Sequence, residues 1–225
     1  FKTEFANLSS GPDDFGHTWS DSNLETNFDF EWIDISAIGT NISFSGNDQS
    51  SDSIEIGFQF PFYGENYSTC IINPNGWLGF GEDNIEWNNS ILPTGTAPQP
   101  AIFGFWDDLN PINENCDQYC SGDIFYHSSP DRFVVWFNDV YHWWLGYEDS
   151  FYNFQIVIYP SGKIQLNYSN IVGTHSATIG IQNGTGSDGI LVSYNNDYIQ
   201  NNLSIRITAG PQWLQGDFTT GNLGS

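Results

Sequence analysis

The chain is poor in positive charge. Of its 225 residues only four are lysine or arginine, against 27 aspartates and glutamates, and the formal net charge is −23. A surface of this kind repels phosphate backbones, so we expect no nucleic acid partner. It repels anionic membrane surfaces for the same reason. Divalent cations are its natural counter-ions, although the same charge also serves plain solubility.

Long apolar runs and cysteines are scarce as well. No segment approaches the roughly 20 apolar residues of a membrane-spanning helix, so we expect no membrane insertion. Only three cysteines occur. Cys116 and Cys120 flank a short acidic loop and are candidates for a small disulfide, whereas Cys70 lies in a strand-like run and is expected to be a buried free thiol. A disulfide would indicate an oxidising compartment.

Helical periodicity is almost absent, and short strand-like runs separated by turn residues take its place. The 18 Phe, 11 Tyr and 9 Trp residues exclude intrinsic disorder. Many short strands at this spacing predict an all-β fold, a mainly antiparallel two-sheet β-sandwich. The expected strands are 30–36, 41–45, 54–60, 67–73, 76–80, 101–106, 123–127, 132–138, 151–159, 163–168, 176–182, 189–194 and 203–208.

The strongest local signal is the turn Pro74-Asn75-Gly76 between two of these runs. Asn-Gly between apolar strands predicts a hairpin, because both residues tolerate positive φ. Around this scaffold we expect three parts. Residues 1–29 form a turn-rich extension that packs on the sandwich, residues 30–210 form the sandwich, and residues 211–225 form a linker or the start of another module.

Several motifs follow one another in a recognisable order. They are Phe58-Gln-Phe60 with Phe62-Tyr63-Gly64, Asn75-Gly76, Phe80-Gly81 and Phe105-Trp-Asp-Asp-Leu109, preceded by Gly11-Pro-Asp-Asp-Phe-Gly16. Together with downstream pieces they span about residues 11 to 208, and the pattern resembles bacterial relatives of nidogen-like (NIDO) extracellular domains. The resemblance implies a non-catalytic extracellular β-module of the kind found in cell-surface proteins, adhesins and secreted proteases. It carries over no catalytic residue.

Two groups of acidic residues are candidate calcium ligands. Asp107 and Asp108 leave an apolar run just before Asn110, and oxygen-rich shells of six to eight ligands suit Ca²⁺. A second group comprises Asp13, Asp14 and Asp21. The alternative in both groups is that each Asp stabilises a turn, with its carboxylate accepting hydrogen bonds from nearby backbone amides. Neither group has the ligand spacing of an EF-hand loop.

An aromatic run between two expected strands is the candidate ligand-binding surface. It contains Tyr141, Trp143, Trp144 and Tyr147. Consecutive Trp143 and Trp144 cannot both face a core in an extended chain, so at least one is expected to be partly exposed. Exposed rings bordered by carboxylates suit stacking on sugar faces, and they equally suit anchoring a protein partner. The alternative is a loop folded down over one end of the sandwich.

No motif for a nucleophile, a zinc protease or a phosphate-binding loop occurs, and the four scattered histidines are expected to be structural. We therefore expect a non-catalytic adhesion or interaction module, extracellular or on the cell surface, stabilised by Ca²⁺ and binding a glycan or protein ligand. One alternative is a subunit of an extracellular filament or coat that self-assembles by strand pairing. Another is an accessory domain of a secreted hydrolase.

Overall fold

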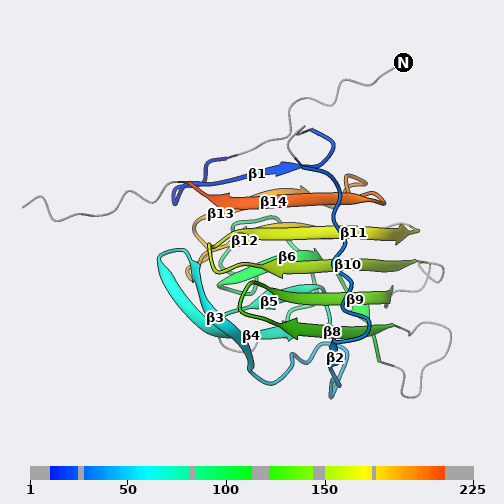
Figure 1. Cartoon of the computed structure of the whole chain (residues 1–225). Helices are drawn as coiled ribbons and strands as arrows, with labels where there is room; N and C mark the ends of the chain where they lie inside the picture. Colours follow the sequence, from blue (N-terminus) through cyan, green and yellow to red (C-terminus); the bar gives the residue numbers. More distant parts are fainter. Residues whose placement is uncertain are drawn as a thin grey trace, which may run out of the picture.

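The structure is a computed structural model that describes residues 11–24, 28–81, 85–112, 122–143, 150–173 and 176–210. In these ranges the chain forms fourteen strands and no helix. They therefore also hold no helix with the length and apolar character of a membrane span. The strands form two antiparallel sheets, one behind the other in Figure 1. The predicted all-β sandwich is confirmed.

The first sheet has the order β1-β14-β11-β10-β9-β8-β2, and β7 also pairs with β9. Its strands are β1 (His17–Asp21), β2 (Thr40–Asn41), β7 (Leu109–Asn110), β8 (Asp123–Ser128), β9 (Phe133–His142), β10 (Phe151–Ile158), β11 (Ile164–Val172) and β14 (Leu203–Ala209). The second sheet has the order β13-β12-β6-β5-β4-β3. Its strands are β3 (Ile54–Phe62), β4 (Glu65–Asn73), β5 (Trp77–Gly79), β6 (Ala101–Trp106), β12 (Thr178–Gln182) and β13 (Gly189–Tyr194). Each sheet thus contains a meander, β8–β11 in the first and β3–β6 in the second.

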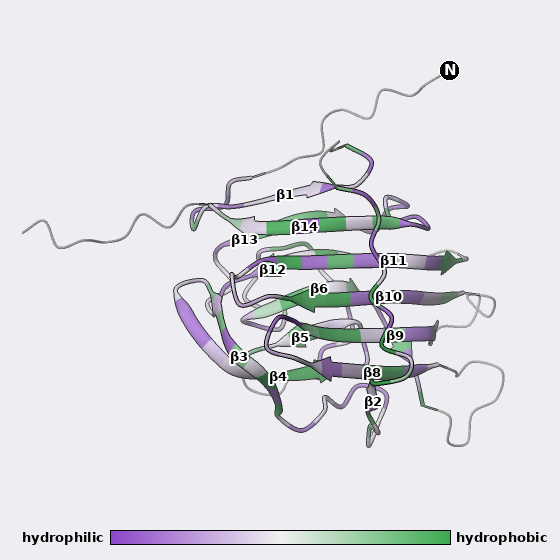
Figure 2. Cartoon of the chain, in the orientation of Figure 1, coloured by the Kyte–Doolittle hydropathy of each residue, from purple (hydrophilic) through white to green (hydrophobic). Residues whose placement is uncertain are grey.

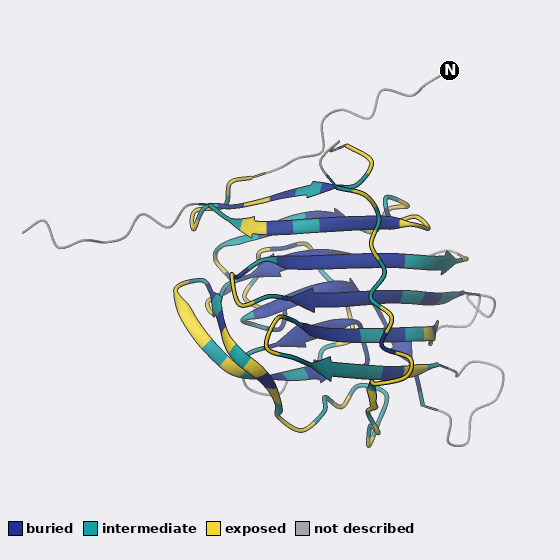
Figure 3. Ribbon diagram, viewed as in Figure 1, coloured by how far each residue is buried: buried dark blue, intermediate teal, exposed yellow. Residues whose placement is uncertain are grey.

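Aromatic rings fill the space between the sheets. Phe154 of β10 stacks on Phe137 of β9, with ring centroids 4.4 Å apart and planes 9° apart, and it also meets Phe105 of β6 in the other sheet. The Tyr168 hydroxyl crosses from β11 to donate to the Gly104 carbonyl of β6 at 2.7 Å. Figure 2 shows hydrophobic stretches along the central strands, and Figure 3 shows these strands as the most buried part. The alternation of apolar and polar residues along a strand is the pattern from which the sequence predicts these strands.

The outer face of the first sheet is covered by the segment between β1 and β2, which runs across the front of the strands in Figure 1. The Gln155 side chain clamps this segment: its Nε2 donates to the Ile33 carbonyl at 2.7 Å and its Oε1 accepts the Ile33 amide at 3.2 Å. Beside this clamp Ile35 packs on Val134 and Val157. The outer face of this sheet is therefore largely sealed from water.

Residues 85–100 cover the outer face of the second sheet in a similar way. The Trp106 indole donates to the Glu86 carbonyl at 3.1 Å. Gln182 of β12 accepts the Thr94 amide at 3.0 Å, and its amide group donates to the carbonyls of the same segment. These contacts fix the start of the segment beside the end of β6, where the candidate site lies.

Three local predictions need correction. The strand expected at 30–36 is wrong, because that segment lies across a sheet instead of within one, and the strand expected at 41–45 shrinks to β2. Part of the expected 1–29 extension is itself a strand: β1 pairs with β14 along its whole length. Its sequence, His-Thr-Trp-Ser-Asp, buries two polar side chains and one apolar one, so hydrophobic alternation does not reveal it.

One of the two cysteine predictions is confirmed, and the other concerns residues outside the described ranges. Cys70 is a buried free thiol, as expected, and burial raises its pKa far above the usual range. Cys116 and Cys120 lie outside the described residues, as does the expected linker 211–225. The disulfide therefore stays a prediction.

Candidate functional site

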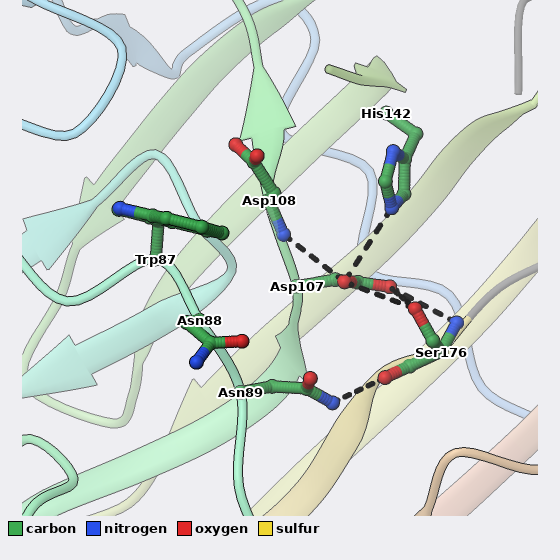
Figure 4. Close-up of a pocket in the computed structure, with 7 residues that line it drawn as sticks. All are labelled: Trp87, Asn88, Asn89, Asp107, Asp108, His142 and Ser176. Carbon is green, nitrogen blue, oxygen red and sulfur yellow. Dashed lines mark hydrogen bonds and ion pairs between the residues drawn. The ribbon is translucent and has the colours of Figure 1, made fainter. Parts of the chain in front are cut away.

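A pocket of about 260 Å³ opens at the end of β6, beside the start of β12 and the end of β9 (Figure 4). We call it the end pocket. It is lined by Trp87, Asn88, Asn89, Asp107, Asp108, His142 and Ser176. The two aspartates come from the residues that link β6 to β7, and the other lining residues come from three separate parts of the chain.

Asp107 acts as an anchor for the wall of the pocket. Its carboxylate accepts the Ser176 amide at 3.0 Å, the Ser176 hydroxyl at 3.1 Å and the Asp108 amide at 3.1 Å. The Nε2 of His142 lies 3.4 Å from the same carboxylate. A carboxylate with this many donors is held firmly in place. Asp107 therefore ties the start of β12 to the end of β6 and has little capacity left for a ligand.

Asp108 is in the opposite situation. It is only 8% exposed, yet none of the hydrogen bonds among the described residues reaches its carboxylate. Figure 4 shows the carboxylate turned away from His142, as expected for neighbours in an extended chain. Burial raises the pKa of this carboxyl to about 6; the charges of Asp48 and Asp107 also raise it, and His142 opposes them. Partial burial of a charged carboxylate costs stability, and perturbed groups of this kind are typical of functional sites.

We expect Asp108→Asn to stabilise the domain at neutral pH. The pKa of Asp108 in the folded domain lies above its ordinary value of 3.8, so the protonated carboxyl stabilises the folded state relative to the ionised one. This stabilisation is fully present below about pH 4 and is lost as the pH rises through about 6. Asparagine carries no charge, so the free energy of unfolding at neutral pH should rise by about 1 kcal/mol, a value reduced because the pocket is open to water. Urea unfolding of both proteins at neutral pH and near pH 4 measures the difference.

The control for this prediction is Asp131→Asn, which changes an exposed carboxyl in the turn before β9. It should leave the free energy of unfolding unchanged at both pH values. The account of Asp108 would be wrong if Asp108→Asn brought no gain at neutral pH, or if it brought the same gain at both.

The Asn-Gly turn between β4 and β5 positions the aspartate pair. The Asn75 side chain accepts the Leu109 amide at 2.9 Å and donates to the Asp48 carboxylate at 3.0 Å. The Asn75 carbonyl accepts the Asp107 amide at 3.3 Å. Asn75 is fully buried. The turn thus holds the chain on both sides of Asp108 and brings the Asp48 charge near it.

The exposed wall of the pocket comes from the segment that covers the second sheet. Asn89 is held in place because its amide group donates to the Ser176 carbonyl, to the Thr178 hydroxyl at 3.1 Å and to the Asn195 side chain at 2.8 Å. Trp87, two residues earlier, is 42% exposed. In Figure 4 the Trp87 ring lies on the side of the pocket opposite His142. The pocket therefore combines an accessible aromatic ring with a buried carboxylate.

The structure places the predicted calcium ligands as follows. Asp107 and Asp108 line one pocket, whereas Asn110 lies in β7, where its side-chain oxygen accepts the Ile112 amide at 3.0 Å. Among the described residues no three His, Cys, Asp or Glu side chains gather in a way that could hold a metal. The calcium site stays a prediction.

The second acidic group is not brought together as a whole. Asp13 and Asp14 precede β1, and Asp21 ends it. The Asp13 carboxylate binds the amide and ring of His17 and accepts the Tyr63 hydroxyl at 2.8 Å. Asp21 accepts two amides of the following turn and the Tyr198 hydroxyl. These contacts are the turn and packing chemistry that was the alternative to metal binding.

The predicted aromatic surface is described only in part. Tyr141, in β9, is half-buried and stacks on Phe151 with ring centroids 5.7 Å apart. Trp143 is 49% exposed, and its amide donates to the Asp108 carbonyl at 2.8 Å. Trp144 and Tyr147 lie outside the described residues. Trp143 is thus joined to the Asp108 segment through its backbone and does not line the end pocket, whereas Tyr141 belongs to the packing of the sheet.

Several pocket residues carry no signal in the sequence that singles them out. Trp87, Asn88 and Asn89 read as an ordinary polar loop, and Ser176 as the start of a strand. His142 is one of four scattered histidines, and only the pairing of β7 with β9 brings it to the aspartates. A pocket built from four segments has no local motif, so the Asp-Asp pair is the part of it that sequence can indicate.

Comparison with protein families finds one match: the model described as NIDO related matches residues 25–212. Comparisons with curated proteins and with solved structures return no match. The matched segment contains every strand except β1, together with all residues that line the end pocket. The chain therefore belongs to the NIDO-related family.

Proposed function

We propose that this domain is a non-catalytic recognition module of a secreted or cell-surface protein, and that it binds a carbohydrate in the end pocket. NIDO-related domains are typically extracellular, which supports the compartment. The observation that carries the proposal is the Asp108 carboxylate, which lines the pocket, opens to the water in it and receives no hydrogen bond from the described residues. A ligand hydroxyl can donate to such an acceptor in place of water.

The aromatic ring at the pocket favours a sugar over other ligands. Trp87 lines the pocket and is 42% exposed. Flat rings next to polar groups suit the mixed apolar and hydroxyl faces of a sugar. A protein partner would be expected to need a wider patch, about 800 Å² on each side. The pocket is a small hollow, and this supports a glycan.

The state of Asp107 supports a binding role over hydrolysis. Cleavage of a glycoside needs two carboxyl groups that both face the bound sugar, one of which exchanges a proton with it. Asp107 is occupied by donors from Ser176, Asp108 and His142. Among the described residues that line the end pocket, this leaves Asp108 as the carboxylate available to a ligand.

The edges of the sheets support recognition ahead of filament assembly. The edge strand β3 contains Pro61 and a register irregularity between Glu55 and Phe60. The hairpin that it forms with β4 is exposed at the margin of the molecule in Figure 3. Proline, bulges and charges on an edge are features that discourage pairing with another chain. One edge of the other sheet is β2, which has only two residues.

The test is a glycan array probed with the fluorescently labelled domain. We expect binding to a subset of glycans, and we expect Trp87→Ala to weaken it about tenfold, because the ring supplies the apolar face of the site. Ile91→Ala is the matched control: Ile91 is as exposed and lies in the same segment, but it does not line the pocket.

Three results would count against the proposal. Absence of binding across the array would contradict carbohydrate recognition. Release of reducing sugar from a bound glycan during prolonged incubation would contradict the non-catalytic role. Equal losses from Trp87→Ala and Ile91→Ala would place the binding site elsewhere on the covering segment.

A further inference from the structure

The charges around the end pocket restrict the kind of sugar that it can take. Asp107 and Asp108 line it, and Asp48 acts on Asp108 from the neighbouring turn. Three of the four lysines and arginines lie in the described ranges, and none of these three lines the pocket. Lys163 rests on the Tyr159 ring and Arg206 on the Phe28 ring; Arg132 lies in the turn that precedes β9, at the end of that strand opposite His142.

Among the described residues that line the pocket, an anionic sugar would therefore meet two carboxylates and no lysine or arginine. Bringing like charges together in a partly buried site is costly, and the net charge of −23 adds long-range repulsion. His142 is the cationic candidate among the lining residues, and its Nε2 already faces Asp107. Uronic acids, sialic acids and sulfated sugars are disfavoured on these grounds.

The hydrogen-bonding groups define what the ligand must offer. An ionised carboxylate is an acceptor only, and its two oxygens lie side by side. Two hydroxyls on adjacent carbons of a sugar ring present two donors in the matching arrangement, and bonds to a carboxylate are about twice as strong as neutral ones. Asn88, exposed at the mouth, adds an amide that can both donate and accept.

The size of the pocket limits how much of a glycan enters. Its volume of about 260 Å³ lies just below the roughly 300–1,000 Å³ of typical small-molecule sites. Asp107 and Ser176 close its inner side through their hydrogen bonds. A hollow of this size suits one ring at the end of a chain, and not an extended chain that passes through.

Resting on the proposed function, we infer that the end pocket binds the terminal neutral pyranose of a glycan, with adjacent hydroxyls donating to Asp108 and one face of the ring against Trp87. Asp108 then serves as the acceptor that selects hydroxyl-bearing, uncharged sugars. Trp87 supplies the apolar contact, and Asp107 and Asn75 position the selecting carboxylate.

The test compares sugars of both classes on the same protein. Ligand-observed NMR titrations with galactose, glucose, mannose and N-acetylglucosamine are set against glucuronic acid and N-acetylneuraminic acid, at neutral pH in EDTA. We expect at least one neutral sugar to bind, and the acidic sugars to bind at least about tenfold more weakly. Asp108→Asn should weaken the neutral sugar about tenfold, Trp87→Ala should do the same, and Asp131→Asn should change nothing.

Each other outcome has a distinct meaning. Acidic sugars that bind as well as neutral ones, or better, overturn the inference and leave carbohydrate recognition standing. Binding that disappears in EDTA and returns with Ca²⁺ overturns direct bonding to Asp108. An Asp108→Asn variant that is folded by circular dichroism and binds like the wild type also overturns it. If neither class binds in the titrations or on the array, the proposed function fails as well.

Discussion

Gly76→Ala is expected to destabilise the domain more than any other change considered for this chain. Gly76 has a φ of +83°, and a Cβ at this position would overlap the backbone carbonyl of Phe105 in β6. β6 has little freedom to move away as a whole, because it is paired on both sides, with β5 and β12. The Gly76 carbonyl also accepts the amides of Gly104 and Phe105, each at 3.0 Å. We expect a loss of at least about 4 kcal/mol in the free energy of unfolding.

The matched control is Gly95→Ala. Gly95 has ordinary backbone angles, and a Cβ there would meet no atom within 4 Å. Its free energy of unfolding should stay within about 0.5 kcal/mol of the wild type. Urea or thermal unfolding followed by circular dichroism gives both values. A Gly76→Ala variant that unfolds like the control would mean that the turn is not packed against β6 as described.

Asn75→Ala is the second large change. It removes the acceptor of the buried Leu109 amide and the donor to Asp48, and Asn75 itself is fully buried. A buried donor left without an acceptor costs about 1–3 kcal/mol, and the lost packing adds to this. We expect the free energy of unfolding to fall by about 3 kcal/mol. Because Leu109 follows Asp108 directly, we also expect the affinity for a pocket ligand to fall.

Asn66→Ala is the matched control for this change, since Asn66 is an exposed asparagine in β4. It should alter neither the free energy of unfolding nor ligand affinity. If Asn75→Ala lowered stability without any effect on affinity, the turn would support the fold alone and would have no part in positioning Asp108.

The Asn-Gly turn shows which features of the fold can be predicted from local sequence and which cannot. Its two residues predict the hairpin between β4 and β5, and the hairpin is present. The sequence does not indicate that Asn75 turns its side chain toward a segment more than thirty residues later, at Leu109. Turn type is a local property of φ and side chain, whereas this docking depends on how the second sheet is stacked.

The same division applies to the end pocket. The Phe-Trp-Asp-Asp motif predicts that something polar follows a buried strand, and both aspartates do line the pocket. Their different states were not predictable, because Ser176 and His142 reach Asp107 only through the pairing of β12 with β6 and of β9 with β7. Trp87 arrives through a covering segment that has no periodic pattern.

The misassigned segments have a related physical cause. Residues 30–36 are rich in apolar and aromatic side chains and read as a strand, but they lie across the face of a sheet, where Ile35 is buried and Ile33 is partly buried. β1 buries His17 and Asp21 beside Trp19, so it reads as a polar extension. The sequence predicts that an apolar side chain will be buried. Whether that side chain lies in a strand or in a segment that covers a sheet depends on tertiary packing.

The Asp108 carboxylate faces the end pocket without a hydrogen bond from the described residues, and the proposed function gives that place to a ligand hydroxyl. The most direct measurement is made on Asp108→Asn, with unfolding by urea and glycan affinity determined on the same preparation at neutral pH. We expect opposite changes: a free energy of unfolding higher by about 1 kcal/mol and an affinity about tenfold lower than in the wild type. A variant that is less stable than the wild type and binds equally well would contradict this expectation, because Asp108 would then be a structural carboxylate.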